Sequence, residues 1–362
     1  MTKPSQNLRP HKPDNMQPSS VLFPKNRNSN LELLRIVCML FIICHHWIVF
    51  ILDNCGYHVP LGDTKQDYTS VFLNSFFIIG VNCYVLISGY FGIKLSWKPI
   101  KKIVGACLFY GALCYFISLA IPPFNSEGFS FLTLLERMYP GNWWFLMEYI
   151  VLILLSPMLN KSIENIDSKT FRLYIILLLI VNVGIGYCLN DRVNKTGYKN
   201  FIMLYYIGRF LNRNFEQHVA YLKRKWLWLV YILSSAMLFI GFIILSKYMD
   251  STRIALKWFG YNNPLVLISS VAFFLIFALT KMKNSVVINT IAASTLVVYI
   301  CHSSNFSMSP IIRAIFAKVN GWYDFPLSYV CLLGYAIVVF AVIVGFDVSM
   351  KTIIRKVKLI FK

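Results

Sequence analysis

The sequence predicts an all-α protein, a polytopic transmembrane helix bundle of about ten spans with both termini in the cytoplasm. Composition is the first observation behind this prediction. Of the 362 residues, 57% are apolar and only 14% are charged, against the roughly 25% charged share of soluble domains. The mean hydropathy is +0.60. A soluble domain of this length could not bury so much apolar surface, whereas a bilayer can.

The second observation is a succession of apolar runs along nearly the whole chain. A spanning helix needs about 20 mostly apolar residues, and most of the runs approach that length. A further segment at 198–212 is shorter and carries Arg209, so it is the doubtful tenth span. The clear runs lie at 31–52, 71–93, 100–121, 143–159, 171–190, 226–246, 262–280, 286–305 and 327–350.

The distribution of Lys and Arg residues predicts the topology. If 198–212 crosses the membrane, 24 of these residues fall on one side and 10 on the other, while Arg35 lies within the first span. If it does not cross, the cluster at 223–225 changes side and the asymmetry largely vanishes. Because cytoplasmic loops accumulate Lys and Arg, the ten-span arrangement with both termini in the cytoplasm is the better prediction.

One transmembrane domain accounts for nearly all of the chain. Residues 1–27 are polar and rich in Pro, Asn, Ser and Lys, which predicts a disordered tail. The domain itself is expected over 28–350, followed by a basic cytoplasmic tail at 351–362. The net charge of +20 is spread over short clusters between apolar runs rather than along one face, so the sequence does not indicate nucleic-acid binding.

The first span contains four ionisable side chains, and each is a functional candidate because charge is costly inside a bilayer. Arg35 and His46 are eleven positions apart, so at about 100° per residue they lie within about 20° of each other. Glu32 falls near the same stripe, whereas His45 points about 100° away from His46. The stripe predicts a polar path about 22 Å long. The alternative is a salt bridge with a separate packing histidine.

Two further spans carry ionisable candidates. His302 lies about 16 residues into its run, at the depth predicted for His46, with Thr295 and Tyr299 on the same helix face. A lone intramembrane histidine is often only a hydrogen bond between helices, but two at one depth suggest a shared site. Glu148 follows an aromatic segment that is typical of a membrane interface. It is either a pathway acid or a hydrated interfacial residue, and the second interpretation is slightly favoured.

The end of the second span suggests a place for an anionic cofactor. A small-residue notch is followed at once by lysines, and glycine permits close backbone approach while Lys supplies charge for phosphate. The alternative is an ordinary basic cytoplasmic loop. The residues concerned are Ser88, Gly89, Tyr90, Lys94, Lys98, Lys101 and Lys102.

Together these motifs resemble the acyltransferase 3 family, bacterial membrane enzymes that move acyl groups from coenzyme A to hydroxyls of surface polysaccharides. The family's first motif, R-x3-L-[DE]-x-L-R with a later His, is similar to Arg27, Leu31, Glu32, Leu34, Arg35 and His46. Its SGY segment with basic residues resembles Ser88 to Lys102, its WFL block resembles 144–157, and its late motif resembles Ser294, Tyr299 and His302. Glu32 stands where the family more often has Asp, and Lys stands where Arg is common after SGY. We expect the single-domain type, without a C-terminal hydrolase-like domain.

The resemblance implies a membrane-bound O-acyltransferase, and specifically an O-acetyltransferase of the cytoplasmic (inner) membrane. Acetyl-CoA would be the cosubstrate, no metal would be needed, and the acceptor would be a hydroxyl of a cell-surface polysaccharide or its lipid-linked precursor. His46 would be the catalytic base and Glu32 would hold Arg35. Arg35 and the SGY-lysine segment would bind the donor, and His302 would orient the acceptor or stabilise the oxyanion.

Two alternatives remain open from the residues. An acyl-histidine intermediate is compatible with the same side chains. A transporter or flippase of lipid-linked sugars would also have ten spans and a polar intramembrane path, although the sequence shows no repeat relating its two halves, a frequent feature of transporters.

Overall fold

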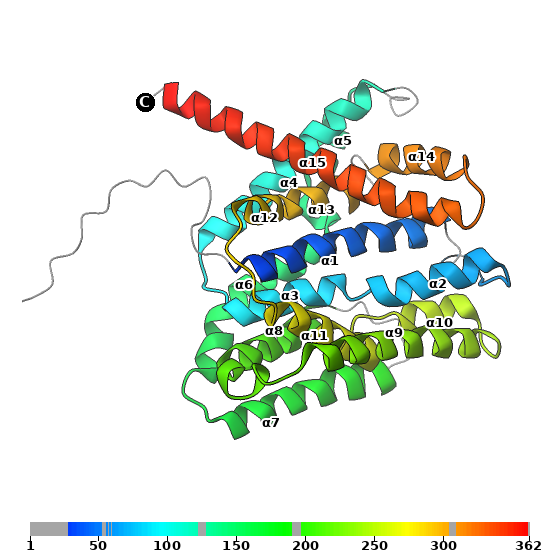
Figure 1. Ribbon diagram of the computed structural model, residues 1–362. Helices are drawn as coiled ribbons and strands as arrows, with labels where there is room; N and C mark the ends of the chain where they lie inside the picture. The colour runs from blue at the N-terminus through cyan, green and yellow to red at the C-terminus, as the bar shows by residue number, and fades with distance from the viewer. Residues whose placement is uncertain are drawn as a thin grey trace, which may run out of the picture.

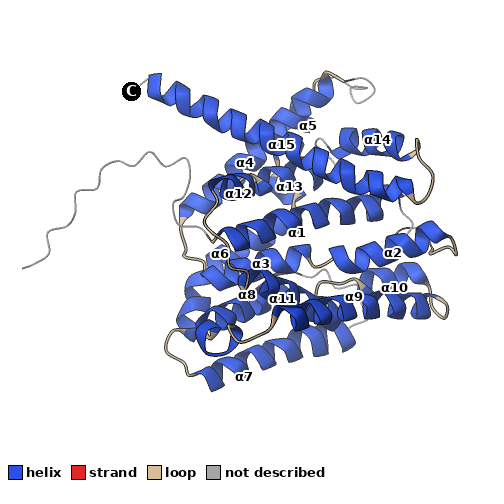
Figure 2. Cartoon of the chain, in the orientation of Figure 1, coloured by secondary structure: helices blue, strands red, loops and turns tan. Residues whose placement is uncertain are grey.

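The computed structural model describes residues 28–52, 56, 58, 60–121, 128–189, 197–303 and 309–360. In these ranges every regular element is helical, which confirms the predicted all-α fold (Figure 2). The tail predicted to be disordered, 1–27, lies outside the described residues, as do most residues of the 53–59 connection.

The helices follow one another through short connections. Three of them continue into or adjoin π-helical turns at Ile48–Leu52, Ile180–Leu189 and Phe215–Val219. The α-helices are α1 (Ser29–Trp47), α2 (Lys65–Phe77), α3 (Gly80–Phe91), α4 (Trp97–Leu119), α5 (Phe131–Met138), α6 (Trp144–Ile163), α7 (Ser168–Leu179), α8 (Tyr198–Arg213), α9 (Arg224–Ser246), α10 (Ser251–Trp258), α11 (Pro264–Ala278), α12 (Val286–Ala292), α13 (Thr295–Ser303), α14 (Ser309–Asn320) and α15 (Leu327–Ile360).

Among the described residues, eight helical segments are long and apolar enough to cross a membrane. Several combine neighbouring elements, such as α2 with α3 and α12 with α13. The other two predicted spans are present as the shorter helices α11, of 15 residues, and α8, of 16 residues. At 1.5 Å per residue these are about 22 and 24 Å long. The structure thus confirms a polytopic helical bundle.

The doubtful tenth segment, α8, lies inside the bundle against α3 and α6. Glycines allow α3 and α8 to approach closely. A Cβ atom on Gly89 would lie 2.8 Å from the Tyr205 Cα atom, and one on Gly208 would lie 2.5 Å from the Leu86 carbonyl oxygen. The buried Asn200 also donates to Asn82 of α3 at 3.2 Å. Asn200, one of the polar residues that weaken the hydropathy of α8, therefore joins this helix to α3.

Helix α1 is the central element and contacts α2, α3, α11, α12, α13 and α15 (Figure 1). Figure 1 also shows that the start of α1 and the end of α15 lie at the same end of the bundle. Both ends of the described chain therefore share one side. Which side faces the cytoplasm stays a prediction.

Helix α15 continues through most of the segment predicted as a C-terminal tail. Its 34 residues span about 51 Å, longer than the roughly 30 Å hydrocarbon core of a bilayer. Residues 351–360 are its last turns rather than a separate segment, and Figure 1 shows this end projecting away from the other helices.

Candidate functional site

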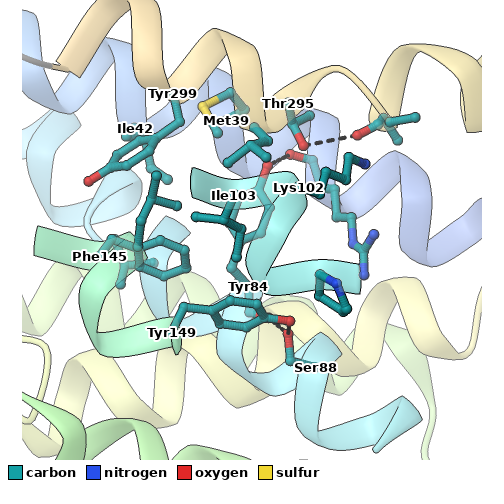
Figure 3. Close-up of a pocket in the computed structure, with 17 residues that line it drawn as sticks. Met39, Ile42, Tyr84, Ser88, Lys102, Ile103, Phe145, Tyr149, Thr295 and Tyr299 are labelled. Carbon is teal, nitrogen blue, oxygen red and sulfur yellow. Dashed lines mark hydrogen bonds between the residues drawn. The ribbon is translucent and has the colours of Figure 1, made fainter. Parts of the chain in front are cut away.

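A cavity of about 230 Å³ lies beside α1, enclosed by α1, α3, α4, α6 and the α12–α13 pair (Figure 3). Its walls are mainly aliphatic and aromatic. Three of the predicted donor-binding residues line it, Arg35, Ser88 and Lys102. Figure 3 shows Tyr299 and Ile42 at one side of the cavity and Lys102 at the other. The other principal wall residues are Met39, Tyr84, Ile103, Phe145, Tyr149 and Thr295.

The predicted pair of Glu32 and Arg35 forms at one end of this cavity. The Arg35 guanidinium lies 3.5 Å from a Glu32 carboxylate oxygen, and the Arg35 side chain is 27% exposed against 5% for Glu32. The Tyr84 hydroxyl donates to the Arg35 carbonyl at 2.7 Å and so joins α3 to α1. Glu32 therefore supports the arginine from behind, while the guanidinium faces the cavity.

Ser88 forms a second polar point on the wall. Its hydroxyl donates to the Tyr84 carbonyl at 3.0 Å and lies 3.2 Å from the Tyr149 hydroxyl of α6. Figure 3 draws both tyrosines beside Ser88. This end of the cavity thus offers hydroxyl groups and a guanidinium, whereas the remainder is mainly aliphatic and aromatic.

A break between α12 and α13 shapes the opposite wall. The run predicted as one span at 286–305 is interrupted at Ala293 and Ser294. Ala292, Ala293 and Thr295 consequently face the cavity. Ser294 is buried, and its hydroxyl has no hydrogen-bond partner within the described ranges.

The structure brings His46 and His302 together. Their ring centroids are 5.2 Å apart, although the two residues are far apart in the sequence. The Tyr299 ring, which lines the cavity, lies 6.1 Å from the His302 ring. The histidine pair is therefore next to the Tyr299 side of the cavity. Two residues after His46, α1 becomes π-helical at Ile48, an irregularity that is frequent at functional sites.

The hydrogen bond of His302 defines its tautomer. Its Nδ1 lies 2.6 Å from the Val298 carbonyl oxygen, and because a carbonyl oxygen only accepts, Nδ1 carries the proton. The Nε2 atom of the neutral ring is then an acceptor. That atom is buried and has no partner in the part of the chain that the structure describes.

His45 has different neighbours from His46. Its Nδ1 is bonded to the Asn74 side-chain oxygen of α2 at 2.6 Å, and both residues are buried. The two adjacent histidines thus point to different parts of the bundle, as the helical spacing predicted.

The other predicted donor-binding residues do not line the cavity. Gly89 packs on α8, and the Tyr90 ring lies 5.5 Å from that of Phe274. Lys98 and Lys101 are exposed on the first turn of α4, and Lys94 lines a different cavity.

The side chain of Glu148, a residue of α6, lies beside the start of α8. A Cβ atom on Gly197 would be 3.2 Å from a Glu148 carboxylate oxygen, so the carboxylate is next to the N-terminus of that helix, where the helix dipole favours negative charge. This position supports a structural interpretation rather than a role beside His46.

Asp347 is an ionisable residue within an apolar run that was not predicted as a site residue. It is 1% exposed, accepts a hydrogen bond from the Tyr110 hydroxyl at 2.6 Å and pairs with Lys351. The rule applied to the first span, that intramembrane charges are candidates, would have found it. Its partners connect α15 to α4. Within the described residues, no group of three His, Cys, Asp or Glu side chains is placed to hold a metal ion.

The fold and the site define a polytopic membrane protein with an arginine, a histidine pair and an apolar cavity inside its bundle. The profile of the acyltransferase 3 family, described as an acyltransferase domain, matches residues 28–345. The chain therefore belongs to the acyltransferase 3 family and is a membrane acyltransferase. No curated protein and no solved structure matches it. The family gives no support to the transporter alternative. Arg27, the first residue of the expected motif, lies outside both the matched range and the described residues.

Proposed function

We propose that this protein is an O-acetyltransferase that moves an acetyl group from acetyl-CoA to a hydroxyl of a cell-surface polysaccharide or its lipid-linked precursor. Membership of an acyltransferase family supports group transfer. The choice of donor, acyl group and acceptor is the proposal.

One observation carries it: a mostly apolar cavity with Arg35 and Lys102 on one side and the histidine pair next to the other. Arg35 and His46 are eleven residues apart on α1, or about 16 Å. That separation suits a long donor whose phosphates remain near the cations and whose thioester reaches towards the histidines. The apolar walls suit the uncharged arm between them.

In the proposed reaction, His46 accepts the proton of the acceptor hydroxyl as the oxygen attacks the thioester carbonyl carbon. The new C–O bond forms and the C–S bond breaks. The sulfur leaves with the bonding electron pair and receives the proton from His46. Glu32 holds Arg35, which binds a phosphate of the donor.

The tautomer of His302 favours one of its two expected roles. With its proton on Nδ1 and bonded to Val298, neutral His302 presents only an acceptor at Nε2. It is suited to orient the acceptor hydroxyl, but it has no proton to donate to an oxyanion in that state. We therefore propose that His302 orients the acceptor beside His46.

Incubation of the purified protein in proteoliposomes with radiolabelled acetyl-CoA and cell-envelope glycan tests the function. Label in the glycan, lost in His46→Ala but not in His45→Ala, is the expected result. Movement of lipid-linked sugar across the membrane without covalent label would contradict it and favour a transporter. Label from longer acyl-CoA but not from acetyl-CoA would contradict the choice of acetyl.

We also propose that the protein lies in the cytoplasmic membrane with Arg35 and the lysine segment towards the cytoplasm. A reporter fused after Lys225 should then behave as cytoplasmic, and one inserted in 191–199 as external. An external reporter after Lys225 would remove α8 as a span.

A further inference from the structure

A second cavity, of about 570 Å³, lies between the ends of α3, α6 and α8 and the first turn of α7. It is at the same end of the bundle as Arg35, because α3 runs from Tyr84, which is bonded to Arg35, past Ser88 to this cavity. Unlike the first cavity it is strongly cationic. Its charged lining residues are Lys94, Lys161, Arg209, Arg213 and Glu164.

Two of the four cations already have partners. Lys161 pairs with Glu164 at 2.7 Å. Arg213 donates to the carbonyl oxygens of Ile163 at 3.3 Å and Ile166 at 2.6 Å, and so caps the end of α6. These two side chains are accounted for by the fold.

The other two cations, Lys94 and Arg209, have no hydrogen bond or ion pair to any residue that the structure describes. The Nε atom of Arg209 is buried and has no partner among the described residues. Gly92, with φ of 74°, makes room for this arginine, since a Cβ atom there would lie 2.8 Å from a guanidinium nitrogen. A partly buried guanidinium without a carboxylate is costly unless an anion is bound.

The wall that carries Gly92 is held rigidly. The Tyr205 hydroxyl accepts from the Ile93 amide at 3.0 Å and donates to the Asn160 side-chain oxygen at 2.6 Å. Asn160 in turn donates to the Ile93 carbonyl at 2.7 Å. This closed set of bonds joins the loop after α3 to α6 and α8, so the backbone next to Lys94 is held against the helix that carries Arg209.

We propose that this second cavity is a binding site for a phosphoryl group, with Arg209 and Lys94 as its ligands. A guanidinium fork and an ammonium together match the charge and geometry of a phosphate. The phosphoryl group belongs either to the nucleotide end of the acyl donor or to the headgroup of an anionic lipid. The site does not depend on acyl transfer, because its test needs no acceptor.

Calorimetric titration of the full-length protein in phosphatidylcholine nanodiscs, with coenzyme A and with dephospho-coenzyme A, tests the first source. Thermal unfolding in phosphatidylglycerol nanodiscs against phosphatidylcholine nanodiscs tests the second. If the ligand is the acyl donor, Arg209→Gln and Lys94→Gln should each lower the affinity for coenzyme A about tenfold. If it is a lipid, each variant should lose most of the stabilisation by phosphatidylglycerol. Lys161→Gln is the matched control, since it removes the same charge from the same cavity but from a side chain already paired with Glu164.

If Arg209→Gln and Lys94→Gln lower the affinity for coenzyme A but not that for dephospho-coenzyme A, the bound phosphoryl group belongs to the acyl donor. A stabilisation by phosphatidylglycerol that vanishes in the variants identifies a lipid. Equal losses of binding in Lys161→Gln and Lys94→Gln would mean that only the overall positive charge of the cavity matters, and this would overturn the site. Unchanged binding in all variants would overturn it as well. If Arg209→Gln does not fold, Arg209→Lys and Lys94→Gln still decide the matter. Binding without any acetyl transfer would contradict the proposed function alone.

Discussion

Two pairs of adjacent residues show how differently the two faces of a helix are used in this bundle. Ser88 faces the cavity and bonds to Tyr149, whereas Gly89 is pressed against the backbone of α8. His46 lies against His302, whereas His45 is bonded to Asn74. One step along a helix, about 100°, separates Ser88 on the cavity wall, or His46 in the histidine pair, from a neighbour packed against another helix.

This difference predicts two kinds of mutational effect. Changes on the cavity side should alter rates or Michaelis constants and leave folding intact. Changes behind it should alter stability and leave the kinetics of the surviving folded protein nearly unchanged. A residue that behaved in the opposite way would break the comparison.

The largest effect is expected for His46→Ala. Loss of a general base lowers rates by about 10²–10⁴-fold, so the turnover number should fall by that factor while the protein remains folded in the membrane. Initial rates with labelled acetyl-CoA, measured beside size-exclusion profiles, provide the check. Retention of more than about a tenth of the activity would exclude His46 as the base.

The next effect concerns stability at Gly89. In Gly89→Ala the new methyl would collide with the Tyr205 backbone of α8, and overpacking of this kind costs about 1–3 kcal/mol. The melting temperature in detergent should therefore fall. Gly105→Ala is the matched control in α4, where no atom lies within 4 Å of the added Cβ. Its melting temperature should stay equal or rise, because Ala favours helix. Equal melting temperatures for both variants would remove the close α3–α8 contact.

Much of the fold could be predicted from the sequence because bilayer thickness imposes a length on apolar runs. The long apolar helices were expected at nearly their observed places, whereas the short helices α5, α10 and α14 were not predicted. The stripe of Glu32, Arg35 and His46 followed from helical spacing alone. The break at Ala293 and Ser294 was not predicted, since hydropathy averages over a window and does not register an interruption of two residues.

Contacts between helices were harder to predict. Whether Gly89 faces a cofactor or another helix depends on the position of α8, which no local pattern contains. Arg209 was noticed only as an obstacle to a span, because its place beside Gly92 and Lys94 requires the tertiary structure. Asp347 was missed although its position within an apolar run was visible in the sequence.

A smaller effect should separate the lysines of the segment after α3. Lys102 and Lys98 are both exposed, but Lys102 lines the first cavity whereas Lys98 lines neither cavity. Charge-assisted hydrogen bonds contribute about 1.5–3 kcal/mol, less at an exposed position. Lys102→Gln should therefore raise the KM for acetyl-CoA by about threefold to tenfold, with little change in the KM for the glycan. Lys98→Gln removes the same charge and should leave the KM for acetyl-CoA unchanged. Equal rises in both would return this segment to its role as a topology signal.

The smallest kinetic effect is expected for His45→Gln, the immediate neighbour of the proposed base. Removal of the imidazole disturbs the buried bond to Asn74, which should lower stability by about 1–3 kcal/mol. The rate per folded molecule should change by less than about threefold, because general-base catalysis is assigned to His46 alone. Activity is to be normalised to the monodisperse fraction, so that loss of folded protein is not counted as loss of catalysis. If His45→Gln were inactive while folded and His46→Ala remained active, the assignment of the two helix faces would be reversed. If both variants were folded and inactive, both histidines would be needed for catalysis, and the role of base could not be assigned to His46 alone.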